Sequence, residues 1–183
     1  MSRGCFIAVV GPSGAGKDSL IRAAVAARPD IVAARRVITR PSDPTEDYES
    51  VDESLFKERQ RAGYFALCWS AHGLMYGVPL EVEKDLAAGR HVMANLSRTV
   101  IDQARQCFQP FQVLVVDAPV EMLATRLAKR GREDVADIQT RLERAAYPPP
   151  EGPDVTVIDN GSDLCAGEAA FIAALPQPVS LKR

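Results

Sequence analysis

The sequence predicts an α/β fold in which helices cover both faces of a parallel sheet. Short apolar runs of β type alternate with helical patterns along most of the 183 residues, an order that is typical of strands joined by crossover helices. The first run, 5–10, is apolar throughout, as expected for a strand buried on both faces. A glycine-rich turn and a helical pattern follow it directly. The length suits one domain with a full hydrophobic core.

Each element has an expected place along the chain. The expected strands are 5–10, 33–39, 91–96, 111–116 and 154–159. The expected helices are 17–27, 78–89, 120–131, 133–146 and 163–175, several of them ended by Gly or Pro. The range 40–77 is polar and turn-rich and then aromatic, so it reads as an insertion over the sheet. We therefore expect a single domain with a core of 1–39 and 78–175 and an insertion of about 40–77.

Composition limits the classes of function. A net charge of -2 gives no sign of a general nucleic-acid-binding surface. No apolar run is long enough to span a membrane, and the first run leads into the glycine turn, which argues against a signal peptide. The scattered cysteines favour reduced thiols over disulfides or a metal site. They are Cys5, Cys68, Cys107 and Cys165. We expect a cytoplasmic globular protein.

The turn after the first strand, GPSGAGKDS at 11–19, matches the P-loop pattern that binds nucleotide phosphates. Its glycines free the backbone to curl around phosphate oxygens, and the following helix directs its positive end to the same place. Lys17 is expected to reach the β- and γ-phosphates. The alternative, a glycine turn with a chance lysine, is disfavoured by the flanking strand and helix. The expected nucleotide ligands are Gly11, Pro12, Ser13, Gly14, Ala15, Gly16, Lys17, Asp18 and Ser19.

Asp18 departs from the pattern, which has Ser or Thr after the lysine to bind Mg²⁺. A carboxylate is also a good Mg²⁺ ligand, directly or through water. Ser19 lies roughly 100° further around the helix, so it cannot simply supply the missing hydroxyl. The alternative is that Asp18 only complements the helix dipole. We favour an altered metal site over a lost one.

Further motifs follow in the order seen in guanylate kinases, which nearly the whole chain resembles. They are TR at 39–40, DY at 47–48, YGVP at 76–79, the arginine-rich segment 126–145 and DVTVIDNGS at 154–162. The resemblance implies that Arg40, Tyr48 and Tyr76 bind the acceptor's phosphate, and that Asn160 lies near the adenine. Arg and Tyr side chains are suitable donors. The alternatives are a solvated Arg40 and tyrosines that only pack.

The same resemblance implies a lid at about 126–145 that closes over the phosphates. Four arginines would supply positive charge there: Arg126, Arg130, Arg132 and Arg141. Arg126 and Arg130 are four residues apart and share a helix face. We expect these two to contact the nucleotide, and Arg132 and Arg141 to reach the transferred group. The alternative is a solvated basic helix paired with its own acidic residues.

Departures from guanylate kinases point to a different acceptor. The Glu that reads guanine is matched here by Leu67, and the Asp residues after the middle strand are matched by Asn95, Ser97 and Arg98. A site stripped of its polar partners discriminates bases poorly. We expect His72 and these three polar residues to contact hydroxyls or a second phosphate instead. For His72, packing or lining of the site is an equal alternative.

The segments GPSGAGKDSL, VITR, WSAHGLMYGV and NLSR together resemble the ribose 1,5-bisphosphate phosphokinases of phosphonate breakdown. The resemblance implies transfer of a phosphoryl group from ATP, with Mg²⁺, to ribose 1,5-bisphosphate, giving 5-phosphoribosyl 1-diphosphate. Two alternatives stay open: a nucleoside monophosphate kinase with other base contacts, and a binding module without catalysis. The expected partners are ATP and a sugar phosphate, without nucleic acid or membrane. A homodimer stays open, because the sequence does not indicate the oligomeric state.

Overall fold

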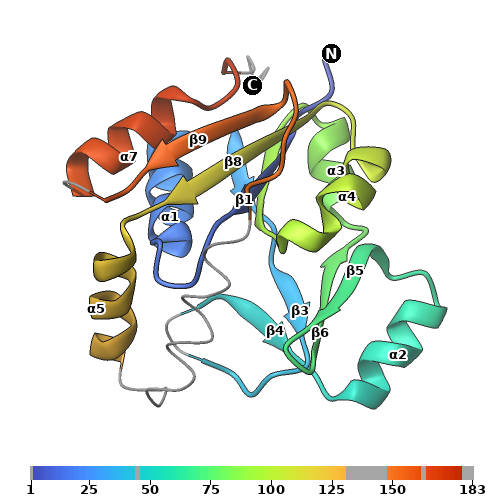
Figure 1. Cartoon of the computed structure of the whole chain (residues 1–183). Coiled ribbons are helices and arrows are strands. Elements are labelled where there is room, and N and C mark those ends of the chain that lie inside the picture. Colours follow the sequence, from blue (N-terminus) through green and yellow to red (C-terminus); the bar gives the residue numbers. More distant parts are fainter. Residues whose placement is uncertain (1, 44–45, 131–147, 162–163, 179–183) are drawn as a thin grey trace.

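The computed structural model describes residues 2–43, 46–130, 148–161 and 164–178, with the backbone alone for 127–130 and 164. The chain forms two sheets that lie side by side (Figure 1). In the described part of the chain, no helix combines the length and the apolar character that crossing a membrane requires.

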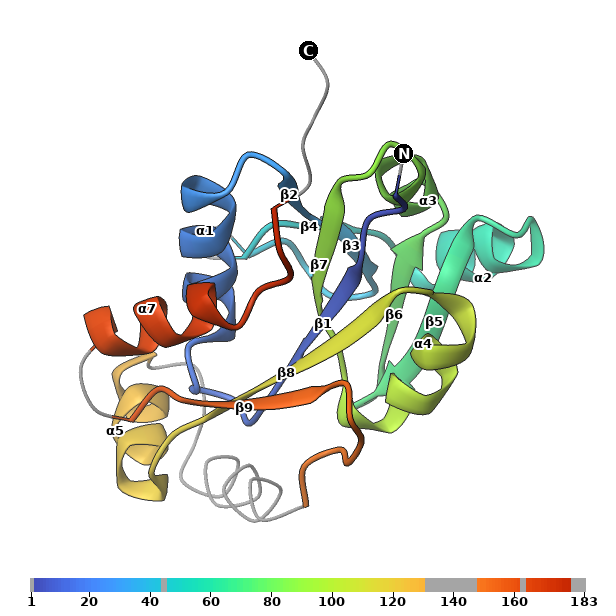
Figure 2. The ribbon, with the colours of Figure 1, turned by 90° about the horizontal axis from the view of Figure 1, so that it is seen from above.

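Sheet A is five-stranded and parallel throughout, as the sequence predicts. Its order is β2 (Ile31–Ala33), β7 (His91–Asn95), β1 (Phe6–Val10), β8 (Phe111–Asp117) and β9 (Val155–Asp159). Helices α1 (Lys17–Ala27) and α7 (Leu164–Ala173) cover one face, and α3 (Val82–Ala87) and α4 (Ile101–Cys107) cover the other (Figure 2). A 3₁₀ turn, η1 (Arg98–Val100), precedes α4, and α5 (Val120–Arg130) follows β8.

Two apolar cores, one on each face of sheet A, explain why β1 is an unbroken apolar run. On one face, Ile7 packs in a cluster with Leu20 of α1 and Phe171 of α7. On the other, Phe6 stacks on Phe108 with ring centroids 3.9 Å apart. Phe6 and Ile7 are neighbours in β1, so their side chains point to opposite faces of the sheet. Both are fully buried, because each face is covered by a core. The sheet therefore fixes the carboxyl ends of β1, β7 and β8, where the site lies.

Sheet B has four strands in the order β4 (Tyr48–Ser50), β3 (Arg36–Ile38), β6 (Leu74–Pro79) and β5 (Phe65–Ala71). β3 pairs in parallel with β4, and the other two pairings are antiparallel. Helix α2 (Glu53–Arg61) packs on β5, where Phe56 stacks on Phe65. The range expected as an insertion, about 40–77, contains β4, α2, β5 and most of β6. β3 belongs to the same sheet and precedes this range in the sequence.

Two of the expected elements are wrong at their boundaries. The single strand expected at 33–39 is two strands, because β2 ends at Ala33 in sheet A and β3 begins at Arg36 in sheet B. The helix expected at 78–89 begins only at Val82, because 78–79 complete β6. Both errors have one physical cause. Apolar periodicity reports burial, and it does not report which sheet a segment joins.

Candidate active site

The P-loop has the geometry that phosphate binding requires. Gly11, Gly14 and Gly16 all have positive φ, at 148°, 85° and 92°. Gly16 caps α1 in the left-handed conformation, so the first N–H groups of this 11-residue helix point into the loop. Lys17 Nζ donates to the carbonyl oxygens of Gly11 and Pro12, at 2.9 and 2.8 Å. The lysine amine thus lies at the mouth of the loop.

Asn160 is buried against the P-loop and binds its backbone. Its side chain is 2% exposed, and its Nδ2 donates to the carbonyl oxygen of Ala15 at 2.7 Å. Among the described residues its Oδ1 has no hydrogen-bond partner. Arg126 of α5 donates to the carbonyl oxygens of Gly14 (3.4 Å) and Asn160 (3.2 Å). Both residues therefore contact the backbone of the loop in this structure.

Asp18 faces the end of β7. Its Oδ1 accepts a hydrogen bond from Asn95 Nδ2 at 3.0 Å. Ser19 is exposed instead, and its hydroxyl lies 3.5 Å from Arg22 Nη2. The structure therefore directs the carboxylate, and not the neighbouring hydroxyl, toward the sheet edge beside the P-loop. A single carboxylate beside nucleotide phosphates is a suitable position for a Mg²⁺ ligand, since Mg²⁺ typically takes one or two protein carboxylates there.

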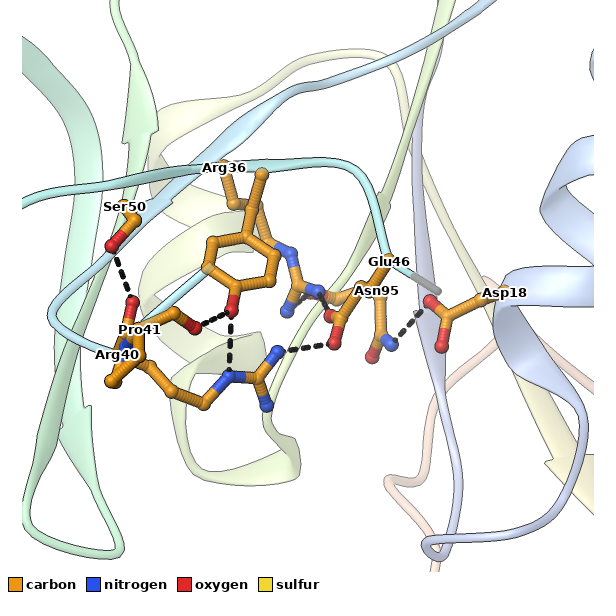
Figure 3. Close-up of polar contacts among 8 residues, drawn as sticks. Asp18, Arg36, Arg40, Pro41, Glu46, Ser50 and Asn95 are labelled. Atoms are coloured by element: carbon orange, nitrogen blue, oxygen red, sulfur yellow. Dashed lines mark hydrogen bonds and ion pairs between the residues drawn. The ribbon is translucent and has the colours of Figure 1, made fainter. Parts of the chain in front are cut away.

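Beyond Asn95 lies a cluster of charges that joins the two sheets (Figure 3). Arg36 Nη1 donates to the Asn95 carbonyl oxygen at 3.0 Å. Both Arg36 and Arg40 form short ion pairs with Glu46, each with a different carboxylate oxygen. Arg40 Nε also donates to the Tyr48 hydroxyl at 3.1 Å, and its guanidinium lies over the Tyr48 ring at 4.6 Å. Contacts run unbroken from α1 to the tyrosine.

The contacts of Arg40 stabilise its protonated form. Burial lowers the pKa of Arg40, but hydrogen bonds with Tyr48 and Glu46 outweigh it and raise the pKa above its ordinary value. The hydroxyl of Tyr48 in turn donates to the Pro41 carbonyl oxygen. Arg40 therefore stays positively charged at neutral pH.

One face of sheet B carries two of the expected acceptor ligands, Tyr48 and Tyr76, together with Arg36. Arg36 pairs with Tyr48 across β3 and β4, and Tyr76 pairs with Ile38 across β6 and β3. Cross-strand partners share a face, as do residues two apart in a strand. Arg36, Tyr48 and Tyr76 thus lie on the same face. Trp69 of β5 stacks on Tyr76 there, at 5.3 Å between ring centroids and 8° between planes.

The base-reading position is closed to a ligand. Leu67 is 1% exposed and packs in the same core cluster as Val78, its cross-strand partner. His72 lies at the exposed tip of the β5–β6 hairpin with φ of 55°. The structure therefore places no polar group at position 67, and it places His72 at the end of the sheet.

Ser97 and Arg98 follow β7 at the carboxyl edge of sheet A. The Ser97 hydroxyl lies 2.9 Å from that of Thr99 and accepts from the Thr99 N–H at 3.4 Å, so it caps η1. Burial lowers the pKa of Arg98, and the carboxylate of Asp117 at the end of β8 partly offsets this. Arg98 therefore lies close enough to the end of β8 to interact electrostatically with the Asp117 carboxylate.

A cavity of about 440 Å³ opens between the P-loop helix and this cluster. Asp18 and Asn95 line it on one side, and Arg36, Glu46 and Tyr48 line it on the other. One residue expected to serve the nucleotide, Asp18, and two expected to serve the acceptor, Asn95 and Tyr48, thus border one space. Such a cavity lies at the size expected for a small-molecule site.

Comparisons with known proteins can now be set beside this geometry. No family model matches the chain. It is 48% identical over 167 residues to the ribose 1,5-bisphosphate phosphokinase PhnN of Ruegeria sp. (strain TM1040), covering 90% of this chain and 88% of the relative. It is 49% identical over 175 residues to the enzyme of that name from Acidiphilium cryptum, covering 94% and 92%.

The chain belongs to the ribose 1,5-bisphosphate phosphokinase family. Because this is a family of kinases, membership implies the use of ATP and a small-molecule acceptor. The chain is also 47% identical to a bifunctional ribose 1,5-bisphosphokinase-thymidine phosphorylase of Cupriavidus pinatubonensis. That match covers 97% of this chain and only 31% of the relative's length.

Solved structures agree on the fold of this family member. A guanylate kinase from Anaplasma phagocytophilum matches with a TM-score of 0.61 and 21% identity, covering 92% of this chain and 81% of that one. A gluconokinase from Sinorhizobium meliloti matches with a TM-score of 0.51 and 18% identity, covering 94% and 92%. These likenesses show a guanylate-kinase-like P-loop fold, as the sequence predicts.

The side chains of three of the expected site residues lie outside what the structure describes. Arg130 ends α5, and its side chain lies outside the described residues, as do Arg132 and Arg141. The expected helix 133–146 lies outside them too.

Two residues of the charged cluster were missed by sequence reasoning. Arg36 is 8% exposed and Glu46 pairs with it. A signal was present: Arg36 lies next to the apolar residues Val37 and Ile38 within the expected strand 33–39, and a charge buried in a strand needs a partner.

Proposed function

We propose that this protein transfers the γ-phosphoryl group of ATP to the C1 phosphate of ribose 1,5-bisphosphate. An oxygen of that phosphate forms a bond to the γ-phosphorus while the bond to the β–γ bridging oxygen breaks. The products are 5-phosphoribosyl 1-diphosphate and ADP. One observation carries the proposal: a complete P-loop faces a sheet of arginine and tyrosine ligands in which the base-reading position is a buried leucine. The two relatives at 48% and 49% identity carry the name of this activity.

The P-loop would bind the phosphates of ATP. Backbone N–H groups of residues 11–19 would hold the phosphates, and Lys17 would leave its loop carbonyls to bind the β- and γ-oxygens. Asn160 and Arg126 support this by fixing the loop backbone. Asp18 fits the Mg²⁺ that accompanies ATP, because it lines the cavity and Asn95 bonds to Oδ1, one of its two carboxylate oxygens. When bound, the ion would offset phosphate charge.

The acceptor side needs positioning more than acid–base chemistry, because a phosphate oxygen is already ionised. Arg40, Tyr48 and Tyr76 would hold the phosphate that is attacked. Polar groups would serve the sugar hydroxyls and the second phosphate: His72 from the β5–β6 hairpin, and Asn95, Ser97 and Arg98 from the carboxyl edge of sheet A. Arg130, Arg132 and Arg141 would bring positive charge to the transferred group as a lid at about 126–145 closes.

The cellular setting is part of the same proposal. The product is an activated ribose 5-phosphate, and we assign the reaction to phosphonate breakdown in the cytoplasm. A single domain with an acceptor-binding insertion at about 40–77 would carry the whole activity. A homodimer would leave this arrangement intact, since every assigned ligand comes from one chain.

A phosphorus NMR time course tests the proposal. The protein is incubated with Mg-ATP and either ribose 1,5-bisphosphate or GMP in separate tubes. We expect a new diphosphate on the sugar, with ADP, in the first tube only. GDP in the second tube would support a nucleoside monophosphate kinase and overturn the reading of Leu67. No product in either tube, with ATP still bound, would reject the acceptor while sparing the P-loop.

A further inference from the structure

Glu46 bridges two arginines from the connection between β3 and β4. Its two carboxylate oxygens are each paired with a different guanidinium, one from Arg36 and one from Arg40. The side chains are 9% exposed for Arg36, 19% for Glu46 and 34% for Arg40. Two cations and one anion leave the cluster with a net charge of +1. Arg36 and Glu46 of this cluster line the cavity that Asp18 borders.

The same donors match a phosphate group. Two guanidiniums aimed at one carboxylate present the forked N–H groups that phosphate oxygens accept. Tyr48 lies beside Arg40 and shares the sheet face of Arg36, and its hydroxyl would turn from the Pro41 carbonyl oxygen to donate to the phosphate. A phosphate dianion in place of the carboxylate would bring the net charge of the two arginines and the ligand to zero. Phosphate and carboxylate together would leave an excess of -1, so the two anions compete.

We propose that Glu46 occupies the place of the acceptor's phosphate on Arg36 and Arg40 and is displaced when that phosphate binds. This assigns Arg36 as a phosphate ligand beside Arg40, and Glu46 as an internal competitor. The inference rests on the proposed function and names a ligand and a control of affinity within that site.

The anchoring of the three side chains supports this division of roles. Arg36 is held by β3 and by its bond to the Asn95 carbonyl oxygen, and Arg40 by its bond to Tyr48. Both guanidiniums thus keep a fixed partner when Glu46 leaves. Glu46 lies in the connection between β3 and β4, and its own backbone N–H bonds only locally, to the Asp43 carbonyl oxygen at 3.2 Å.

The test measures binding of inorganic phosphate by calorimetry. The P-loop is first saturated with Mg²⁺ and the non-hydrolysable analogue β,γ-imido-ATP, so that phosphate reports on the acceptor site. Glu46→Gln removes the competing charge and is expected to tighten phosphate binding about tenfold. Arg36→Lys keeps the charge but loses the fork, and is expected to weaken binding at least about tenfold.

A matched control lies three residues away on the opposite face of β4. Glu49 pairs with Arg59 at 2.8 Å, outside the cluster. Glu49→Gln removes the same charge from the protein and should leave phosphate affinity unchanged. Any general effect of net charge would appear in both variants. If Glu46→Gln does not fold, Glu46→Asp provides the test, because its shorter side chain cannot span both guanidiniums and should also tighten binding.

The opposite reading makes Glu46 a permanent counterion for the two arginines. Unchanged or weaker phosphate binding by the Glu46 variants would establish that reading and overturn the proposal. The result is separable from the proposed function, because inorganic phosphate contains no ribose. Tighter phosphate binding without turnover of ribose 1,5-bisphosphate would reject the acceptor and keep the role of Glu46. Turnover of ribose 1,5-bisphosphate, with phosphate affinity unchanged in the Glu46 variants, would keep the acceptor and reject the role of Glu46.

Discussion

Gly16→Ala tests whether the P-loop is held as the structure shows. Gly16 has φ of 92° and ψ of 15°, a left-handed conformation that costs a residue with a Cβ about 1 to 2 kcal/mol. A Cβ there would also lie 2.6 Å from Asn160 Nδ2. Moving that amide breaks its buried bond to Ala15, which costs about 1 to 3 kcal/mol. We expect a loss of about 2 to 5 kcal/mol in unfolding free energy.

The assay is urea unfolding followed by circular dichroism, with Gly63→Ala as the matched control. Gly63 also has a positive φ, 72°, but a Cβ there would meet no atom within 4 Å. The control therefore carries the backbone cost alone, about 1 to 2 kcal/mol. The double variant Gly16→Ala/Asn160→Ala removes the clashing amide, so its loss should be smaller than the sum of the two single losses.

Two results would refute this reasoning. Equal losses for Gly16→Ala and Gly63→Ala would mean that the Cβ meets no obstacle at Gly16. Strict additivity in the double variant would mean that Asn160 is not the obstacle. The same variants link stability to function, because a displaced loop should bind ATP more weakly, whereas the Gly63 control should bind it normally.

Three further predictions concern single side chains. Lys17→Ala should lower turnover by about 10²- to 10³-fold with an unchanged circular dichroism spectrum, and near-normal turnover would contradict the P-loop role. Asp18→Ala should raise the Mg²⁺ concentration needed for activity and weaken Mg²⁺ binding to the ADP complex in calorimetry; unchanged values would leave Asp18 as a helix-dipole residue. Burial raises the pKa of Cys5 to about 11, so at pH 8 its thiol stays protonated, and a disulfide reagent should modify exposed Cys107 and Cys165 first. Rapid modification of Cys5, located by mass spectrometry of the peptides, would show that it is not buried.

Much of the fold follows from the sequence, because sheet A is buried on both faces. Its central strand β1 is an unbroken apolar run, and α1 runs from Lys17 to Ala27 as the pattern predicts. The P-loop is equally visible, since its function depends on consecutive residues. Patterns of this kind are local, and the residues that make them are adjacent in the chain.

The acceptor face is less predictable because it depends on pairing between short strands. β3 and β4 have three residues each, too few to show a period. Whether Arg36 shares a face with Tyr48 is decided by their register, which a shift of one residue would reverse. The partner of Arg36, Glu46, is ten residues away and belongs to no regular element. Only the folded chain brings these three together.

Asp18 departs from the usual P-loop residue, and Asn95 departs from the Asp residues of guanylate kinases. These two departures depend on each other. The usual P-loop has a hydroxyl after its lysine, and guanylate kinases, which the chain resembles, have Asp residues in the segment that matches Asn95. Here the carboxylate is on the helix and the amide is on the strand, joined at 3.0 Å. An Asp at both positions would place two carboxylates in contact and raise the pKa of one. Asn95 avoids this, and its carbonyl oxygen also accepts from Arg36. One neutral residue therefore links the proposed metal ligand to the proposed acceptor ligand.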